Sequence, residues 1–213
     1  MWIDVSVPLD SPHPSWPTSP GAQISCHQDF TMGHSQDSLL TMDVHCGTHV
    51  EALAHVRDGG AGLTSFAPDQ LCGQVSVVDG RQMVEVPASV LSQVPISIDG
   101  ILVKTDNSER ALMRLTEFHE DFVGWSVEFT EAAAARPGLK FVGADYLSVQ
   151  PYGGDSRVHA AVLEAGVAIV EGLDLSDVTP GRYEMLGLFL SMPTREAAPA
   201  RVLLRPVTEG APS

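Results

Sequence analysis

Residues 45–55 read His-Cys-Gly-Thr-His-Val-Glu-Ala-Leu-Ala-His, so three of the chain's eight histidines and one carboxylate fall within eleven residues. His45 and His49 are four apart, as are Glu51 and His55, and one unbroken helix would bring each pair to a single face. His49 and Glu51, however, are two apart, a spacing that shares a face only in a strand. Gly47 permits a sharp change of direction, so the stretch predicts a bend rather than one regular element.

This bend suggests how four ligand-type side chains could converge. We expect a strand to deliver His45, a turn to follow, and His49 and Glu51 to project from irregular backbone before His55 returns from the next turn. Imidazole nitrogens and a carboxylate suit Zn²⁺, Mn²⁺ or Fe²⁺. The competing interpretation is that these histidines are buried core residues with satisfied hydrogen bonds. We expect Cys46 to be a small buried hydrophobe rather than a further ligand.

The composition indicates one folded domain. The chain has 213 residues, of which 44% are hydrophobic and 18% charged, values that exclude intrinsic disorder. Twelve Lys and Arg stand against 27 Asp and Glu, a formal net charge of −15. A chain with this much negative charge repels nucleic-acid phosphates and anionic membrane surfaces. We therefore expect neither a nucleic acid nor a membrane as a partner.

Strand signals dominate the chain, and helical signals are fewer. The order predicts a single mixed, strand-rich α/β domain over residues 1–213. The expected strands are Trp2–Val7, Leu39–His45, Gln74–Asp79, Gly100–Thr105, Leu139–Gly143, Val167–Glu171, Tyr183–Leu190 and Ala200–Leu204. The expected helices are Pro87–Gln93, Thr130–Arg136 with Thr130 as a possible N-cap, and Ser156–Ala165 ending at Gly166.

The cellular setting follows from cysteine use and the start of the chain. The chain has three cysteines, a small and odd number that does not suit a disulfide framework. No stretch approaches the ~20 apolar residues of a membrane span, and residues 1–8 do not read as a secretory signal. We therefore expect a cytoplasmic protein.

At residues 45–55 the sequence resembles the metal-dependent cyclase/hydrolase family that includes bacterial kynurenine formamidase. The family signature is His-x-Gly-Thr-His-x-Asp-x-Pro-x-His. Similarities continue along nearly the whole chain. They lie at 3–9 (the first strand), Ser15-Trp16-Pro17 (a Trp-Pro turn), 142–148 (a Gly-x-Asp-x-x-Ser segment), His159 with 166–171 (a second ligand segment), and 183–186 with 198–201 (the closing strands).

The resemblance implies a fold of the kynurenine formamidase/cyclase type with a binuclear metal site, most often zinc, with manganese possible. In that site His45, His49 and Glu51 hold one ion, and Glu51 also reaches a second ion held by His159 and Glu171. His55 would act as the proton donor and acceptor, and Trp16 would lie along the substrate. A homodimer or larger homo-oligomer is implied as well.

The residues of the second segment also indicate a metal site when the family resemblance is set aside. His159 falls on the expected helix 156–165, and Glu171 closes the apolar run 167–170. Burying that carboxylate without a charge partner would be costly, and a metal ion supplies one. The alternative is that Glu171 is a strand-end residue exposed to water.

Two positions depart from the family signature. The usual Asp is Glu51, whose extra methylene moves the carboxylate by about one C–C bond. The usual Pro is Leu53, so the turn before His55 is less constrained. Neither change removes a ligand type, but Glu51 leaves open which metal binds and whether one or two ions do.

These observations predict a metal-dependent, arylformamidase-like hydrolase, with tryptophan catabolism as the setting that the resemblance implies. Metal-activated water would cleave an amide, formamide, lactam or lactone of a small, aromatic substrate. One alternative is a metal-dependent cyclase of aromatic polyketide metabolism, in which His55 removes an α-proton. The other is a catalytically inactive binding protein on the same fold.

Overall fold

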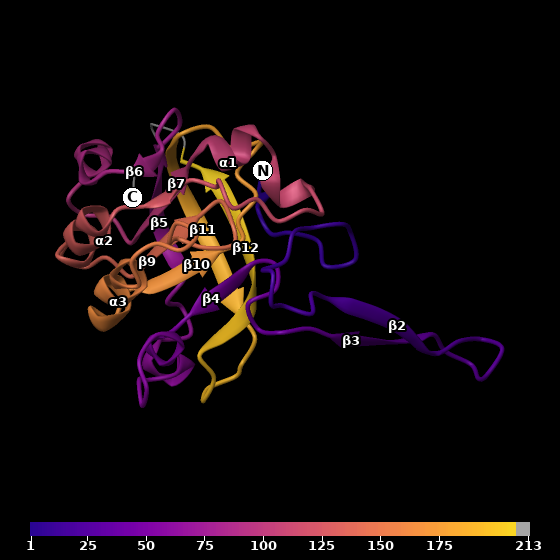
Figure 1. Ribbon diagram of the computed structural model, residues 1–213. Helices are drawn as coiled ribbons and strands as arrows, with labels where there is room; N and C mark the ends of the chain where they lie inside the picture. Colours follow the sequence, from indigo (N-terminus) through magenta and orange to yellow (C-terminus); the bar gives the residue numbers. More distant parts are fainter. Residues whose placement is uncertain (208–213) are drawn as a thin grey trace.

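A closed β-barrel forms the centre of the computed structural model, which describes residues 1–207 (Figure 1). The strand order is β1-β12-β11-β5-β7-β9-β10-β4, and β4 pairs with β12 as well as with β10. This second pairing closes the strands of this sheet, except β1, into a barrel. The strands are β1 (Ile3–Asp4), β4 (His49–Glu51), β5 (Cys72–Asp79), β7 (Gly100–Lys104), β9 (Phe141–Ala144), β10 (Ala168–Glu171), β11 (Gly181–Phe189) and β12 (Ala197–Pro206).

Strand direction divides the barrel into two parts. The neighbours β5, β7, β9 and β10 run parallel, whereas β4, β11 and β12 join by antiparallel pairing. Parallel strands need crossover connections, and here these carry most of the helical structure. The helices are α1 (Asp106–Glu109), α2 (Val127–Ala134) and α3 (Arg157–Glu164), with 3₁₀ turns at Leu53–His55, Leu63–Ser65, Ala88–Gln93 and Leu112–Arg114. The mixed α/β class expected from the sequence is confirmed.

Alternate residues along the strands serve two cores. Leu102 of β7 belongs to the apolar cluster inside the barrel, whereas its neighbours Ile101 and Val103 belong to a second cluster. That second cluster includes residues of α2 and α3, which cover one side of the barrel (Figure 1). Because both faces of these strands are buried, they read as continuous apolar runs. No helix within residues 1–207 is long and apolar enough to cross a membrane.

Two short sheets lie outside the barrel. β6 (Glu85–Val86) pairs with β8 (Gly124–Trp125) beside the helices. β2 (Gln23–Gln28) and β3 (Asp37–Thr41) form an antiparallel ribbon that projects away from the barrel (Figure 1). Nearly every residue of this ribbon is exposed.

The chain bends differently around His45 than the sequence predicts. The strand expected at Leu39–His45 ends at Thr41, and His45 lies in a turn. The side chain of Asp43 accepts a hydrogen bond from the His45 backbone N–H at 2.8 Å, which closes that turn. The irregular backbone expected at 49–51 is instead strand β4, so the regular and irregular parts are exchanged.

Other boundaries shift by smaller amounts. The first strand shortens from Trp2–Val7 to β1, because β12 pairs with only two of its residues. The N-cap of α2 is Ser126, whose hydroxyl accepts from the Phe129 backbone N–H, rather than Thr130. The expected helix 156–165 is confirmed as α3, and Gly166 follows it with φ +77°.

Two glycines hold the turn after His45 against the end of β10. Gly47 and Gly172 have φ of +68° and +70°, a region that side chains disfavour. A Cβ on Gly172 would lie only 2.2 Å from the backbone oxygen of Gly47. The hydroxyl of Thr48 donates to the Gly172 carbonyl at 2.6 Å. Close backbone contact therefore fixes His45 and His49 relative to β10.

We predict that Gly172→Ala lowers the free energy of unfolding by about 2 kcal/mol or more, because it adds a steric clash to the cost of positive φ. Gly138→Ala is the matched control, since Gly138 has φ +77° but nothing within 4 Å of an added Cβ. It should lose only about 1 kcal/mol. Denaturant unfolding measures both, and equal losses would contradict this account of the contact.

Candidate metal centre

The site is built on the outer surface of the barrel, where β4 and β10 face α3. His49 and Glu51 are two residues apart on β4 and therefore project from the same side. The register pairs His49 with Glu171 of β10. All three are almost fully buried, with 0%, 1% and 2% of their surface exposed. Two buried carboxylates thus lie beside an imidazole.

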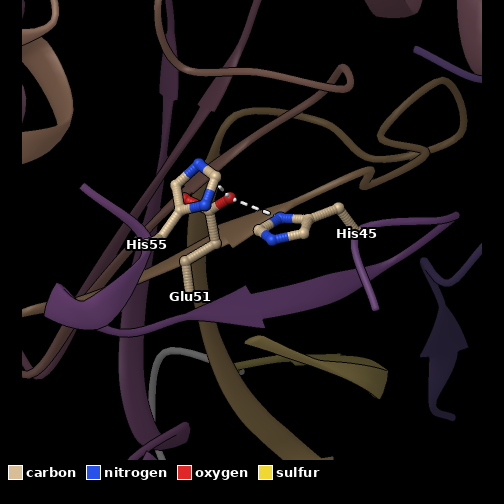
Figure 2. A group of neighbouring side chains, drawn as sticks. All are labelled: His45, Glu51 and His55. Atoms are coloured by element: carbon tan, nitrogen blue, oxygen red, sulfur yellow. Dashed lines mark hydrogen bonds and ion pairs between the residues drawn. The ribbon is translucent and has the colours of Figure 1, made fainter. Parts of the chain in front are cut away.

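Two further histidines approach Glu51 from the turns on either side of β4. Nδ1 of His45 lies 2.9 Å from Oε1 of Glu51 and 3.3 Å from Nε2 of His49. Nε2 of His55, at the end of the 3₁₀ turn Leu53–His55, lies 3.5 Å from the same carboxylate oxygen. Figure 2 shows the His45 and His55 rings close to this carboxylate. A turn thus forms before His55 without the proline of the family signature.

The second segment completes the cluster from the α3 side. Nε2 of His159 lies 3.2 Å from Oε1 of Glu171 and 3.6 Å from Oε2 of Glu51. The Val149 backbone N–H donates to Oε1 of Glu171 at 2.6 Å. Glu171 is therefore buried and engaged, which excludes the alternative of a strand-end residue in water. Residues separated by more than one hundred positions meet at one point.

The structure thus brings together all five residues for which a metal-ligand role is predicted, with His55 beside them; the roles themselves stay predictions. Two groups have ligand atoms that all lie within 4.8 Å of one another: His45 with Glu51 and His55, and His49 with Glu51 and Glu171. Glu51 belongs to both groups. Its Oε2 is buried and has no hydrogen-bond partner, so this oxygen is free for a cation.

The orientation of His49 also fits a ligand. Its Nδ1 lies 3.0 Å from the backbone carbonyl oxygen of Gly47, so this nitrogen carries the proton and donates. Nε2 therefore faces the cluster, 3.5 Å from Oε2 of Glu171, and would release its proton to coordinate a metal ion. A backbone carbonyl that fixes the imidazole tautomer is a common partner of metal-binding histidines. The donor set of imidazoles and carboxylates therefore fits one or two ions such as Zn²⁺ or Mn²⁺.

Electrostatics in the cluster favour added positive charge. Burial alone would lower the pKa of His49, but hydrogen bonds to Glu171 and Glu51 outweigh it and raise the pKa to about 10. For Glu51, burial raises the pKa, but His45 and His49 hold it well below its usual range. The paired carboxylates thus attract a proton or a metal ion.

His55 behaves in the opposite way. Its side chain is 34% exposed, but burial of the rest of the ring lowers its pKa, and this effect exceeds the attraction of Glu51. The imidazole is therefore neutral near pH 7 and can accept a proton. This difference separates His55 from the more deeply buried histidines.

The cluster opens into a cavity of about 550 Å³. Trp16 lines it, and the Trp16 ring packs against Phe118 and Tyr152 with centroids 5.0 and 5.7 Å apart. Asp43 and Glu196 line it as well. The sequence predicts a site role for Trp16 but for none of the other four. Asp43 reaches the cavity through the local turn at His45, whereas contacts between distant parts of the chain bring Glu196 to the cavity and the two aromatic rings to Trp16.

A barrel that carries a buried His/Glu cluster at the wall of a cavity defines a class of metal-binding α/β domains. The family described as "Putative cyclase" matches residues 3–151, and the chain belongs to it. Cyclase-like protein 3 of Arabidopsis thaliana is 32% identical over 94% of this chain and 78% of its own length. The kynurenine formamidase of Sphingopyxis alaskensis is 31% identical over 97% of this chain and 98% of its own length. The predicted family resemblance is confirmed.

Solved structures agree on the fold. A protein from Bacillus stearothermophilus, described as a "predicted metal-dependent hydrolase", superimposes with a TM-score of 0.79 at 29% identity over 96% of this chain and 97% of its own. An isatin hydrolase bound to the product analogue thioisatinate gives a TM-score of 0.77 at 16% identity, covering 97% of this chain and 92% of its own. That second likeness bears on the fold alone.

We predict that Glu51→Asp lowers metal content by a fraction without emptying the site. The shorter side chain moves the carboxylate back by about 1.5 Å, whereas metal sites tolerate about 0.2 Å in ligand distance. One ion should therefore bind more weakly, while an ion held mainly by His45 and His49 persists. Elemental analysis after metal reloading measures this, with Glu85→Asp on the exposed β6 as the control. Unchanged metal content and an unchanged rate would show that Glu51 is not a ligand.

Proposed function

We propose that this protein is a metal-dependent hydrolase that cleaves an amide, formamide, lactam or lactone of a small aromatic substrate. One observation carries the proposal: two buried carboxylates and three histidines from separate segments converge at the wall of a cavity that Trp16 also lines. Relatives named kynurenine formamidase support hydrolysis of such bonds.

In this proposal His45, His49, Glu51, His159 and Glu171 hold one or two divalent ions, zinc or manganese. A bound ion would supply a Lewis acid that lowers the pKa of water and polarises a carbonyl oxygen. The protein's own contribution is to fix the donors: Gly47 orients His49, and Val149 donates to Glu171.

His55 is the residue that we assign to proton transfer. Its Nε2 faces the carboxylate of Glu51 at 3.5 Å, and part of its ring lines the cavity. A neutral imidazole there can take a proton from the attacking water and return it to the leaving group. Trp16 would lie against the substrate, since it offers a flat apolar face already braced by Phe118.

A cyclase is the second candidate, and the family description favours it. The same cluster could polarise a carbonyl while His55 removes an α-proton. The mass of the product distinguishes the two reactions. Hydrolysis adds one water molecule to the mass of the substrate, whereas ring closure removes one water molecule or leaves the mass unchanged.

The proposed function is tested by assaying the zinc- and manganese-loaded protein on N-formylkynurenine, isatin and simple aryl lactones. We expect hydrolysis of at least one class, and His55→Ala should lose about 10²-fold or more in turnover while it keeps its metal. Glu85→Gln is the control and should keep full activity, because the exposed Glu85 side chain lies outside the cavity lining. Metal-loaded protein that hydrolyses none of these classes would contradict the proposal. If His55→Ala lost metal as well, His55 would be a ligand instead.

We also propose that the protein forms a homodimer or larger homo-oligomer, with the β2–β3 ribbon packed on a second copy. An isolated two-stranded ribbon is marginally stable in water, and both faces of this one carry exposed apolar residues: Ile24 and Leu40 on one, Leu39 on the other. Light scattering should give at least twice the 22.7 kDa of the chain. The double variant Ile24→Lys, Leu40→Lys should dissociate it, and a monomeric wild type would contradict the proposal.

A further inference from the structure

The wall of the cavity carries negative charge on two sides. Asp43 and Glu196 line it in addition to Glu51 and Glu171, whereas no Lys or Arg of the described chain does. Glu51 and Glu171 are enclosed by the histidines of the metal centre. Asp43 and Glu196 are not part of that cluster, so their charges face whatever enters the cavity.

The backbone fixes both of these residues close to His45. Asp43 accepts hydrogen bonds from the His45 backbone N–H and from the hydroxyl of Ser19. The Glu196 carbonyl accepts from the Ala52 backbone N–H at 2.8 Å, which ties the start of β12 to the end of β4. The Glu196 carboxylate is 38% exposed and lies 4.0 Å from Nε2 of His45.

No Lys or Arg within residues 1–207 neutralises either carboxylate, although a metal ion held by His45 would offset part of their charge. Among the described residues, Asp43 forms no ion pair with Lys or Arg, and the long contact with His45 is the single pairing of Glu196. Hydrogen bonds to neutral donors hold Asp43 in place but leave its charge intact. An independent observation also points to a ligand here, because Glu51 lines the cavity and its buried Oε2 has no hydrogen-bond partner.

We propose that this cavity selects substrates whose aryl group is uncharged or carries an ammonium group, that it rejects those with a carboxylate, and that Glu196 and Asp43 set this preference. The inference rests on the proposed hydrolase function and names its substrate class. At roughly 7 Å, with an effective dielectric constant between about 20 and 80, one carboxylate changes the affinity for a unit charge about 3- to 50-fold. The Trp16 ring, which lines the same cavity, adds a cation–π surface for an ammonium group.

The test uses three formanilides that differ at one meta substituent: aminomethyl, hydroxymethyl and carboxymethyl. The methylene group insulates the scissile amide, and rates of alkaline hydrolysis correct for any remaining electronic difference. We expect the metal-loaded protein to prefer the aminomethyl over the carboxymethyl compound at least tenfold in kcat/KM at low salt. Added salt should reduce this preference, because the cavity opens to solvent.

Variants assign the preference to its residues. Glu196→Gln should reduce the aminomethyl-to-carboxymethyl ratio of kcat/KM about threefold or more, and Asp43→Asn should also lower it. Glu85→Gln, at the exposed residue of β6, removes the same charge from outside the cavity lining and should leave the ratio unchanged. Binding of benzylammonium, measured by calorimetry, should weaken in Glu196→Gln but not in Glu85→Gln, a result that does not depend on turnover.

The outcomes separate this inference from the proposed function. Hydrolysis of all three formanilides at equal corrected rates would uphold the hydrolase and overturn the selectivity. A preference that Glu196→Gln and Glu85→Gln reduce equally would overturn the role of Glu196. If none of the three is hydrolysed, yet benzylammonium binding weakens in Glu196→Gln alone, the charge preference stands and the assigned reaction is wrong.

Discussion

The burial of two carboxylates side by side is the constraint on which the rest of the site depends. Glu51 and Glu171 lie on adjacent strands, and both are almost fully removed from water. Such a pair is strongly unfavourable unless positive charge and hydrogen bonds compensate it. His45, His49 and His159 surround the pair within 3.6 Å. A cluster of this kind is costly as a structural feature and is explained by a function that needs a cation.

The barrel supplies the rigidity that such a cluster requires. Strand β4 closes the barrel by pairing with both β10 and β12, and its pairing with β10 sets His49 opposite Glu171. Because Gly172 has no side chain, the backbone at the end of β10 can touch the turn at Gly47. Because alternate strand residues face the barrel interior and the helix layer, the ligands can project outward while Val50 and Val170 fill the core. The fold therefore holds the site without using loops for its most buried members. A negatively charged cavity wall is then added by residues just outside β4 and β12.

Much of this could be predicted from the sequence, because the strands are apolar runs and the ligands occur in two short segments. Strands β5, β7 and β10 and helix α3 lie close to where the pattern places them. The bend at residues 45–51 was predicted with its parts exchanged, since the pattern does not reveal that Asp43 closes a turn at His45. Glu196 could not be predicted as a cavity residue, nor Phe118 and Tyr152 as the residues that pack against Trp16, because their positions depend on contacts across the whole chain. Strand β2 of the exposed ribbon was missed because its pairing buries almost nothing, whereas β3 overlaps the strand expected from Leu39.

The central claim is that the cluster around Glu51 binds divalent metal. Its most direct test is elemental analysis of the purified, mildly reloaded protein, combined with anomalous X-ray scattering at the metal absorption edge. The account predicts one or two zinc or manganese ions per chain, with density between Glu51, Glu171 and the histidines that face them. A metal content below about 0.2 ion per chain, or an ion bound elsewhere, would contradict it.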